Sequence, residues 1–201
     1  MIDALFEFLG FIAEFRTGYP FRGAIEPVEG GTVAVVQIKD VSPSQAVTWD
    51  AVVRTELTGR RAPEWLASGD ILLVARGNRY YAVALDTVPD RAICGPHLYH
   101  LRLKGGAEIL PQFIAWQINQ PPIQRLLSQA AEGSNQLSIR RAELEALPIS
   151  VPALAVQEHI VRLAEVAERE RALLNQLVRN RERQMSALAS ALNDAAIREK
   201  N

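Results

Sequence analysis

Residues 147–161 read Leu-Pro-Ile-Ser-Val-Pro-Ala-Leu-Ala-Val-Gln-Glu-His-Ile-Val and separate two different parts of the chain. Pro148 and Pro152 keep the residues before them out of the helical region, so this stretch begins as an extended strand. Neither glycine nor proline follows Pro152, and the remaining residues are mainly Ala, Leu, Glu, Arg and Gln, which favour helix. The sequence therefore predicts a domain over residues 1–152 and a long helix over residues 153–201.

Apolar residues recur along the expected helix at alternating steps of three and four, which is the spacing of a coiled-coil seam. The seam residues are Ile160, Leu163, Ala167, Leu174, Leu177, Leu188 and Ala191, with polar interruptions at Glu170, Arg181 and Gln184. Residues 155–198 would extend over roughly 60 Å as a helix. A helix of this length needs a partner for its apolar face. We expect coiled-coil packing in a dimer or against another subunit; the alternative is a helix that folds back onto its own domain.

Upstream of residue 147, short apolar runs are separated by glycine and proline, which is typical of strands and turns. Four runs predict strands, at residues 32–38, 70–75, 80–85 and 98–103. Gly77-Asn78-Arg79 lies between the second and third runs and predicts a hairpin connection. Together the four strands suggest a small, strongly bent sheet.

Short helices are expected on both sides of these strands. Apolar residues at helical spacing predict an amphipathic helix over residues 2–16, and its apolar face holds Leu5, Phe8, Leu9, Ile12 and Phe15. Pro111 suits the first position of a helix over residues 112–120, and a second helical piece is expected over residues 123–131. Ser138 is expected to cap a further short helix. The predicted fold class is α+β: a small bent-sheet domain with short helices, followed by a long C-terminal coiled-coil helix.

The composition allows a buried core but gives no overall basic character. The chain has 201 residues, 48% of them hydrophobic, and 22 Lys and Arg residues against 23 Asp and Glu residues, for a net charge of −1. Binding to nucleic acid would therefore require a local basic cluster or basic partner subunits. The single cysteine, Cys94, excludes an intrachain disulfide and fits a small buried hydrophobe in a reducing, cytoplasmic setting.

The sequence offers no motif for membrane insertion or for catalysis. Acidic residues interrupt the apolar N-terminus, so neither a signal peptide nor a membrane span is expected. There is no Gly-x-Ser-x-Gly elbow, phosphate-binding Gly-Lys-Thr loop, paired His-Glu-His motif or Asn-Pro-Pro-Tyr motif. His97, His100 and His159 lack the carboxylate spacing that would complete a metal site. We expect no enzymatic activity, no metal and no bound cofactor.

Five segments, taken in order, resemble the specificity subunits of type I restriction–modification systems. They are residues 36–41 (a first core strand), 69–77 (the family's Gly-Asp-Ile-Leu segment), 109–116 (its Leu-Pro segment), 132–136 (a closing loop) and 137–161 (a short helix, a Leu-x-Ile-Pro-x-Pro strand and the start of a conserved helix). That helix usually opens with Glu-Gln, whereas this chain has Gln157-Glu158. The resemblance covers residues 16–192.

Full specificity subunits carry two recognition domains and two long helices, whereas this chain has one of each. It is similar to half-length subunits that assemble as homodimers, which implies an antiparallel dimer through the long helix. The resemblance implies a sequence-specific DNA-recognition subunit that binds double-stranded DNA and docks a DNA methyltransferase (modification) subunit. In that family S-adenosylmethionine is held by the modification subunit, and an ATP-driven restriction subunit is a further partner.

Polar loop residues are the candidates for DNA contacts, because Arg, Lys, Asn and Gln form paired hydrogen bonds with guanine or adenine. One candidate loop holds Arg76, Asn78, Arg79 and Tyr80, and a second holds Arg54, Arg60 and Arg61. The candidates for phosphate contacts are Lys39, Ser134, Asn135 and Gln136. Each group also has a structural interpretation: a solvated turn beside core tyrosines, an exposed charged turn, or helix capping.

A second function class fits the same sequence. The chain could be a protein-interaction adaptor of a defence complex, in which the recognition fold persists without reading DNA. The mildly acidic net charge favours this alternative. Salt-dependent binding to random duplexes, followed by enrichment of one motif from a library, would separate the two.

Overall fold

A computed structural model describes residues 4–43, 46–59, 61–77, 79–105, 108–132 and 138–198. The chain divides into two compact units, residues 1–161 and residues 162–201. We call the first unit the head. It extends nine residues beyond the expected boundary at residue 152, because Gln157 is fully buried and Ile160 and Val161 pack against the core of the head.

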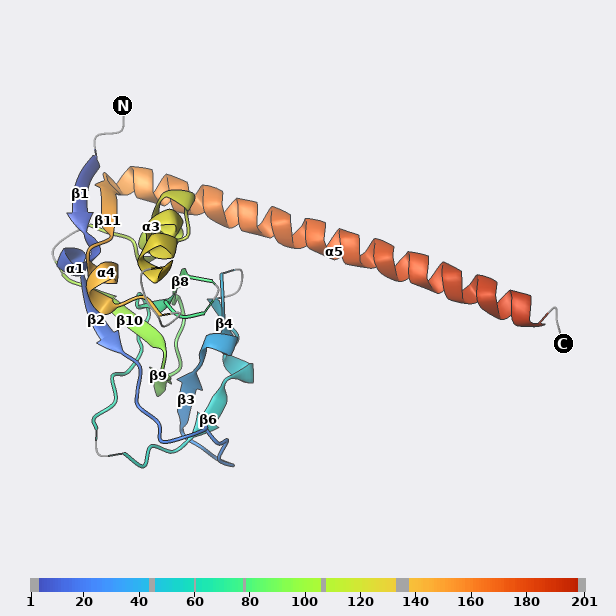
Figure 1. Cartoon of the computed structure of the whole chain (residues 1–201), viewed down its shortest axis with the longest axis horizontal. Helices are drawn as coiled ribbons and strands as arrows, with labels where there is room; N and C mark the ends of the chain where they lie inside the picture. The colour runs from blue at the N-terminus through green and yellow to red at the C-terminus, as the bar shows by residue number, and fades with distance from the viewer. Residues whose placement is uncertain are drawn as a thin grey trace. The chain divides into compact units, whose positions relative to one another are not determined.

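A four-stranded antiparallel sheet forms the centre of the head (Figure 1). Its strands, in spatial order, are β2 (Ala13–Thr17), β10 (Leu98–Leu103), β7 (Ile71–Val74) and β8 (Tyr81–Ala84). All four residues of β7 are buried. Ile71 and Leu73 belong to one hydrophobic core, and Leu72 and Val74 belong to a second core on the opposite face. A strand buried on both faces explains why its sequence is apolar throughout rather than alternating.

Four short helices cover the Ile71 and Leu73 face. They are α1 (Leu9–Ile12), α2 (Pro111–Ile118), α3 (Pro121–Glu132) and α4 (Arg141–Glu145). The helices predicted after Pro111 and around residues 123–131 are confirmed, and Pro111 occupies the first turn of α2 as expected. Their most deeply buried residues are Leu9, Ile114, Ile118, Leu127 and Leu144.

A second, three-stranded sheet covers the other face. Its order is β6 (Val53–Thr55), β3 (Val33–Val36) and β9 (Ala92–Cys94), with β3 and β9 parallel. Small elements follow β3: η1 (Ile38–Asp40), β4 (Val41–Ser42), β5 (Ala46–Val47) and η2 (Trp49–Ala51). The predicted strands are therefore confirmed, but they form two sheets rather than the single bent sheet expected. The α+β class is confirmed.

Cys94 lies in the core between the two sheets. Its side chain is buried, and burial raises the pKa of the thiol to about 12. The interpretation of Cys94 as a small buried hydrophobe is confirmed.

The helix predicted over residues 2–16 is wrong. The segment forms β1 (Ala4–Phe8), the single turn α1 and then β2. β1 pairs antiparallel with β11 (Pro148–Pro152), where Phe6 lies opposite Ser150, and β2 pairs with β10. Strand partners 140–148 residues away for β1 and 82–90 residues away for β2 therefore override the local helical spacing.

Ser138 is not a helix cap either. It forms an isolated β-bridge with Arg76, and the residue that precedes α4 is Arg140. The strand expected over residues 147–152 is confirmed as β11.

Side-chain amides of the α2 region cover two strand edges. Asn119 accepts a hydrogen bond from the Ala82 N–H (2.9 Å) and donates one to the Ala82 carbonyl (2.8 Å), on the outer edge of β8. Gln117 makes the same pair of bonds with Ser150 of β11, at 2.7 and 2.9 Å. Each amide thus occupies the place that a neighbouring strand would take.

The long C-terminal helix is confirmed as α5 (Leu154–Arg198). Its first turns are held by Gln157, whose Oε1 accepts from the Leu110 N–H at 3.0 Å. The Nε2 of Gln157 donates to the carbonyls of Glu108 (3.0 Å) and Pro152 (2.8 Å). Both the oxygen and the nitrogen of the Gln157 amide therefore have hydrogen-bond partners inside the head, which explains a buried glutamine at the start of the helix. In the part of the chain that the structure describes, no helix is long and apolar enough to cross a membrane.

Candidate nucleic-acid interface

The ends of several strands meet along one rim of the head. β3 and β9 run in parallel and end side by side at Val36 and Cys94, joined by a hydrogen bond from the Gly95 N–H to the Val36 carbonyl (2.7 Å). β7 runs antiparallel to β10, so its end at Val74 lies opposite Leu98 at the start of β10. The segments that follow β3, β7 and β9 therefore emerge at the same side of the two sheets.

Four polar residues follow or precede these strand ends. We call Lys39, Arg76, Arg79 and His97 the rim cluster, and all four are exposed. Lys39 follows β3, Arg76 follows β7, Arg79 precedes β8, and His97 lies in the turn between β9 and β10. Tyr81 links two of these segments, because its hydroxyl donates to the Val41 carbonyl at 2.9 Å. Three of the residues in the cluster were predicted from the sequence.

His97 was missed as a candidate for this site. The Nη1 atom of Arg76 lies 2.7 Å from Nδ1 of His97, so the guanidinium donates to the imidazole when that nitrogen carries no proton. The backbone of His97 has a φ of 72°, which is uncommon outside glycine. Gly95-Pro96 immediately before it is a sequence signal for a turn with positive φ at the next residue. That signal could have identified the turn, although not its contact with Arg76.

A close backbone approach supports this turn. A Cβ atom on Gly18 would lie 1.8 Å from the Gly95 carbonyl oxygen, so only glycine fits at position 18. The Gly18 N–H donates to the Leu98 carbonyl (3.1 Å), and the Tyr19 N–H donates to the Cys94 carbonyl (2.8 Å). The chain that leaves β2 therefore holds both ends of the turn that presents His97.

The segment after the predicted closing loop also reaches the rim. Ser138 bridges Arg76, and the Ile139 N–H donates to the Ala75 carbonyl at 2.9 Å. Of the predicted candidates, Arg60, Asn78, Ser134, Asn135 and Gln136 lie outside the described residues. Tyr80 is partly buried against the core beside the helices, so the structure places it at the base of the hairpin.

Arg54 and Arg61 are exposed but do not belong to the rim cluster. Arg54 lies opposite Ala34 in the outer strand of the second sheet. β6 runs antiparallel to β3, with Thr55 opposite Val33, so the chain that leads to Arg61 leaves the sheet where β3 begins. The structure thus places the two loops that the sequence offers as candidates at different sides of the head.

A buried ionic network holds the opposite end of β7. Asp70 accepts hydrogen bonds from Nε and Nη2 of Arg102, both at 2.7 Å, and from the Ala67 N–H at 2.7 Å. The Nε2 atom of the fully buried His100 lies 2.7 Å from Oδ2 of Asp70, although without hydrogen-bonding geometry. Burial alone would raise the pKa of Asp70, but Arg102 and His100 outweigh it and lower the pKa from 3.8 to about 2.

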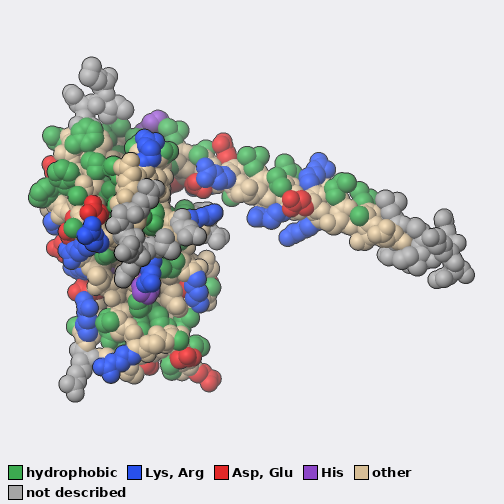
Figure 2. All heavy atoms as spheres, viewed as in Figure 1, with side chains coloured by type: hydrophobic (Ala, Val, Ile, Leu, Met, Phe, Trp, Pro, Cys, Tyr) green, Lys and Arg blue, Asp and Glu red, His purple; other side chains and the backbone are tan. Residues whose placement is uncertain are grey.

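On the side of the head that Figure 2 shows, the described Lys and Arg side chains do not gather into one basic face. Figure 2 shows Lys and Arg side chains spread along the visible side of the head, with acidic and hydrophobic side chains between them. This distribution agrees with the net charge of −1. Among the described residues, no group of three or more His, Cys, Asp or Glu side chains could hold a metal ion.

The apolar seam of α5 is exposed beyond the head. Leu163, Leu174, Leu177 and Leu188 are each more than half exposed, and Ala167 is also exposed. Ile160 differs from the other predicted seam residues, because it is partly buried against the core of the head. An exposed leucine row of this length is typical of a surface that another helix covers.

No protein-family model and no curated protein matches the chain, but solved structures do. A chain from a structural study of complex assembly and conformational transition of the type I R-M system matches with a TM-score of 0.67 and 17% identity, over 92% of this chain and 43% of that one. The HsdS subunit from Thermoanaerobacter tengcongensis matches with a TM-score of 0.60 and 18% identity, over 86% and 39%. The type I restriction–modification S subunit from M. genitalium matches with a TM-score of 0.50 and 12% identity, over 88% and 44%.

This chain spans less than half the length of each of these three chains. At identities below a fifth the likeness concerns the fold. The chain, with one head and one long helix, therefore has the fold of part of a type I specificity subunit.

Proposed function

We propose that this chain is a sequence-specific DNA-recognition subunit of a type I restriction–modification-like system. It directs a DNA methyltransferase subunit, and a restriction subunit where one is present, to a target sequence. Two observations support the proposal: the specificity-subunit fold and the rim cluster at the strand ends. The chain itself performs no chemistry in this scheme, and S-adenosylmethionine is bound by the methyltransferase in the cytoplasm.

The rim cluster is the observation that carries the proposal. Arg76 and Arg79 present planar guanidinium groups that can bond both acceptors on the major-groove edge of a guanine. Lys39 offers a point charge suited to a phosphate. Because the chain has no overall positive charge, a few local contacts supply recognition and the partner subunits supply the remaining affinity for the DNA backbone.

The α5 helix provides the assembly surface. Its a and d positions form a narrow apolar seam, and further exposed apolar residues flank that seam, Val166 and Leu173 on one side and Val178 and Met185 on the other. A two-stranded coiled coil needs only the narrow seam, whereas a wider apolar face suits contact with more than one helix. We therefore assign the seam to a second copy of the chain and the flanking residues to the methyltransferase subunit.

DNA selection with the intact chain tests recognition. A random duplex library is enriched for bound sequences, and binding to the selected duplex is measured by fluorescence anisotropy at several salt concentrations. Arg76→Ala and Arg79→Ala should each weaken binding to the selected duplex by about 1–3 kcal/mol if the side chain reads a base, and relax the sequence preference at one position. Lys39→Ala should weaken binding to all duplexes equally.

Arg54→Ala is the matched control, because Arg54 is an exposed arginine away from the rim. It should leave binding to the selected duplex unchanged. Failure to enrich any motif, or equal losses for Arg54→Ala and Arg76→Ala, would contradict the assignment of DNA reading to the rim.

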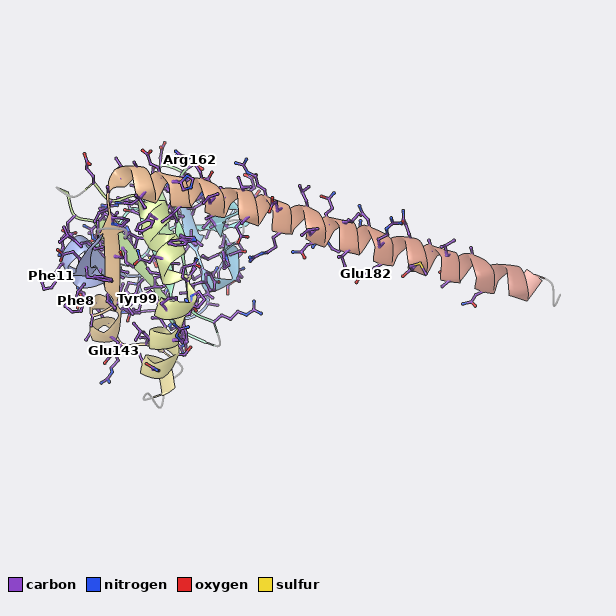
Figure 3. The ribbon with its side chains drawn as sticks, turned by 90° about the horizontal axis from the view of Figure 1, so that it is seen from above. Phe8, Phe11, Tyr99, Glu143, Arg162 and Glu182 are labelled. Carbon is purple, nitrogen blue, oxygen red and sulfur yellow. The ribbon has the colours of Figure 1, made fainter. Side chains whose placement is uncertain are left out.

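An exposed aromatic surface favours the adaptor as a second candidate function. Leu5, Phe6, Phe8 and Phe11 are 51–75% exposed on β1 and α1, and Figure 3 shows Phe8 and Phe11 side by side on the same part of the head. A groove of about 590 Å³ between α3 and α4 adjoins Phe8. Apolar surfaces of this kind are typical of protein contacts. A chain that shows no salt-dependent binding to random duplexes and selects no motif, but still recruits a methyltransferase, would be an adaptor.

A further inference from the structure

The polar residues within the α5 seam follow a pattern that the seam leucines alone do not explain. From Leu163 the seam positions are residues 163, 167, 170, 174, 177, 181, 184 and 188, in alternating steps of four and three. Glu170, Arg181 and Gln184 occupy three of them. Charged residues at such positions weaken a coiled coil unless the partner helix offers a complementary group.

We propose that two copies of this chain pair through α5 in a single antiparallel register, in which Glu170 of each copy faces Arg181 of the other. The proposal rests on the proposed function for the presence of two copies. The centre of the pair then lies between Asn175 and Gln176, and the two-fold axis makes the Glu170–Arg181 contact occur twice.

This register also gives compatible partners at the other seam positions between residues 163 and 188. Once Glu170 faces Arg181, Leu163 faces Leu188 and Leu174 faces Leu177. Ala167, the smallest seam residue of the first half, faces Gln184 and leaves room for the longer side chain. Each a position meets a d position of the partner, which is the layer arrangement of an antiparallel coiled coil.

Registers shifted by one heptad give Glu170 and Arg181 poorer partners. A slip by one heptad in one direction places Glu170 against Leu174 and Arg181 against Leu163. A slip in the other direction places them against Leu188 and Leu177. Either shift places the charged groups of Glu170 and Arg181 against leucine side chains. They then lose part of their hydration without an ionic partner, which raises the free energy of the dimer. The charged seam residues therefore select one alignment, as buried polar residues do in other coiled coils.

The distribution of charge along α5 independently favours the antiparallel arrangement. Residues 154–170 hold four acidic and two basic side chains, for a net charge of −2, whereas residues 171–191 hold one acidic and four basic side chains, for a net charge of +3. An antiparallel pair brings unlike halves together. A parallel pair would bring Glu170 against Glu170 and Arg181 against Arg181, which is repulsive at both levels.

A charge-swap series tests the register by its effect on dimerisation of the full chain. Glu170→Arg alone and Arg181→Glu alone each create two like-charge contacts per dimer, so sedimentation equilibrium should show dimer dissociation constants raised by about tenfold or more. The double variant Glu170→Arg with Arg181→Glu should recover the original dissociation constant. Glu182→Arg is the control: Glu182, labelled on α5 in Figure 3, lies next to Arg181 but off the seam, and should have no effect.

Cysteine crosslinking provides a second readout that does not depend on charge. The double variant Glu170→Cys with Arg181→Cys should give covalent dimers under mild oxidation, whereas Glu170→Cys alone should not. In this register the two copies of residue 170 lie about 16 Å apart along the helix axis, well beyond the roughly 7 Å that a disulfide spans between Cα atoms. The native Cys94 is buried and does not interfere.

The outcomes separate this proposal from the proposed function. Efficient crosslinking by Glu170→Cys alone, no rescue by the charge-swapped double variant, or a chain that stays monomeric at micromolar concentration would each overturn the register. A monomer that still selects a DNA motif would overturn the register and leave recognition standing. A dimer with this register that selects no motif would support the register and refute DNA recognition.

Discussion

Replacing Asp70 by asparagine removes the charge at the centre of the buried network that holds the start of β7. Asp70 is 2% exposed and accepts hydrogen bonds from Arg102 and from the Ala67 N–H, with His100 beside it. Asparagine has nearly the same shape but carries no charge and offers one acceptor oxygen instead of two. The partly buried Arg102 then loses its counter-charge and one of its two carboxylate acceptors, where β7 begins beside β10.

The magnitude follows from the pKa of Asp70, which is about 2 against an ordinary 3.8. At about 1.4 kcal/mol per pH unit, the lowered pKa corresponds to about 2 kcal/mol of stability. Because the folded pKa lies below the unfolded value, this stability is present above pH 3.8 and is lost as the pH falls towards 2. Asp70→Asn should therefore lower the free energy of unfolding at pH 7 by about 2–4 kcal/mol, since a broken buried pair also leaves its partner uncompensated.

Urea unfolding followed by tryptophan fluorescence measures this effect, because Trp65 offers its carbonyl to Arg102 at 3.0 Å and lies next to the network. The difference in stability between the native chain and Asp70→Asn should be constant from pH 7 to about 4 and should shrink by about 2 kcal/mol between about pH 4 and 2. Asp50→Asn, at an exposed position in η2, is the control and should change little. A difference that does not depend on pH would refute the ionic interpretation of the network.

Two further predictions concern buried side chains of the head. Cys94 should resist alkylation by iodoacetamide at pH 8 in the folded chain and react readily in urea, because burial raises the pKa of its thiol to about 12; rapid labelling of the folded chain would contradict this. Gln157→Ala should destabilise the head by about 2–3 kcal/mol in urea unfolding, because three hydrogen bonds at the start of α5 are lost. Gln176→Ala, at an exposed position of α5, should leave the head unaffected.

The sequence predicted correctly those strands and helices whose own residues carry a clear pattern. The apolar runs became β7, β8 and β10, Pro111 opened α2, and the glycine- and proline-free tail became α5. The N-terminal segment shows the limit of such patterns. Leu9, Ile12 and Phe15 are buried as the helical spacing predicts, but Leu5 and Phe8 are exposed. Their strand conformation depends on pairing with β11, which no local window contains.

The site was predicted less completely than the fold. Arg76, Arg79 and Lys39 were proposed by residue type, but the placement of their segments at the same side of the sheets depends on the parallel pairing of β3 with β9, across more than fifty residues. His97 was assessed only as a metal ligand, and its role beside Arg76 follows from a turn geometry that sequence alone does not fix. The sequence distinguishes Arg76 from Arg54 only by its place in the family-like segment 69–77 and beside a predicted hairpin, and it does not show that Arg54 lies within a strand of the second sheet.

The amides of Asn119 and Gln117 have a further consequence for assembly. A sheet whose outermost strand has free N–H and carbonyl groups can join the sheet of another molecule and grow without limit. Here a single asparagine occupies the main-chain groups of Ala82, and a glutamine occupies those of Ser150. At these two positions sheet-to-sheet association is blocked, so stacking of heads into fibres is disfavoured. A protein that must place two heads at a fixed spacing benefits when self-association is confined to helices.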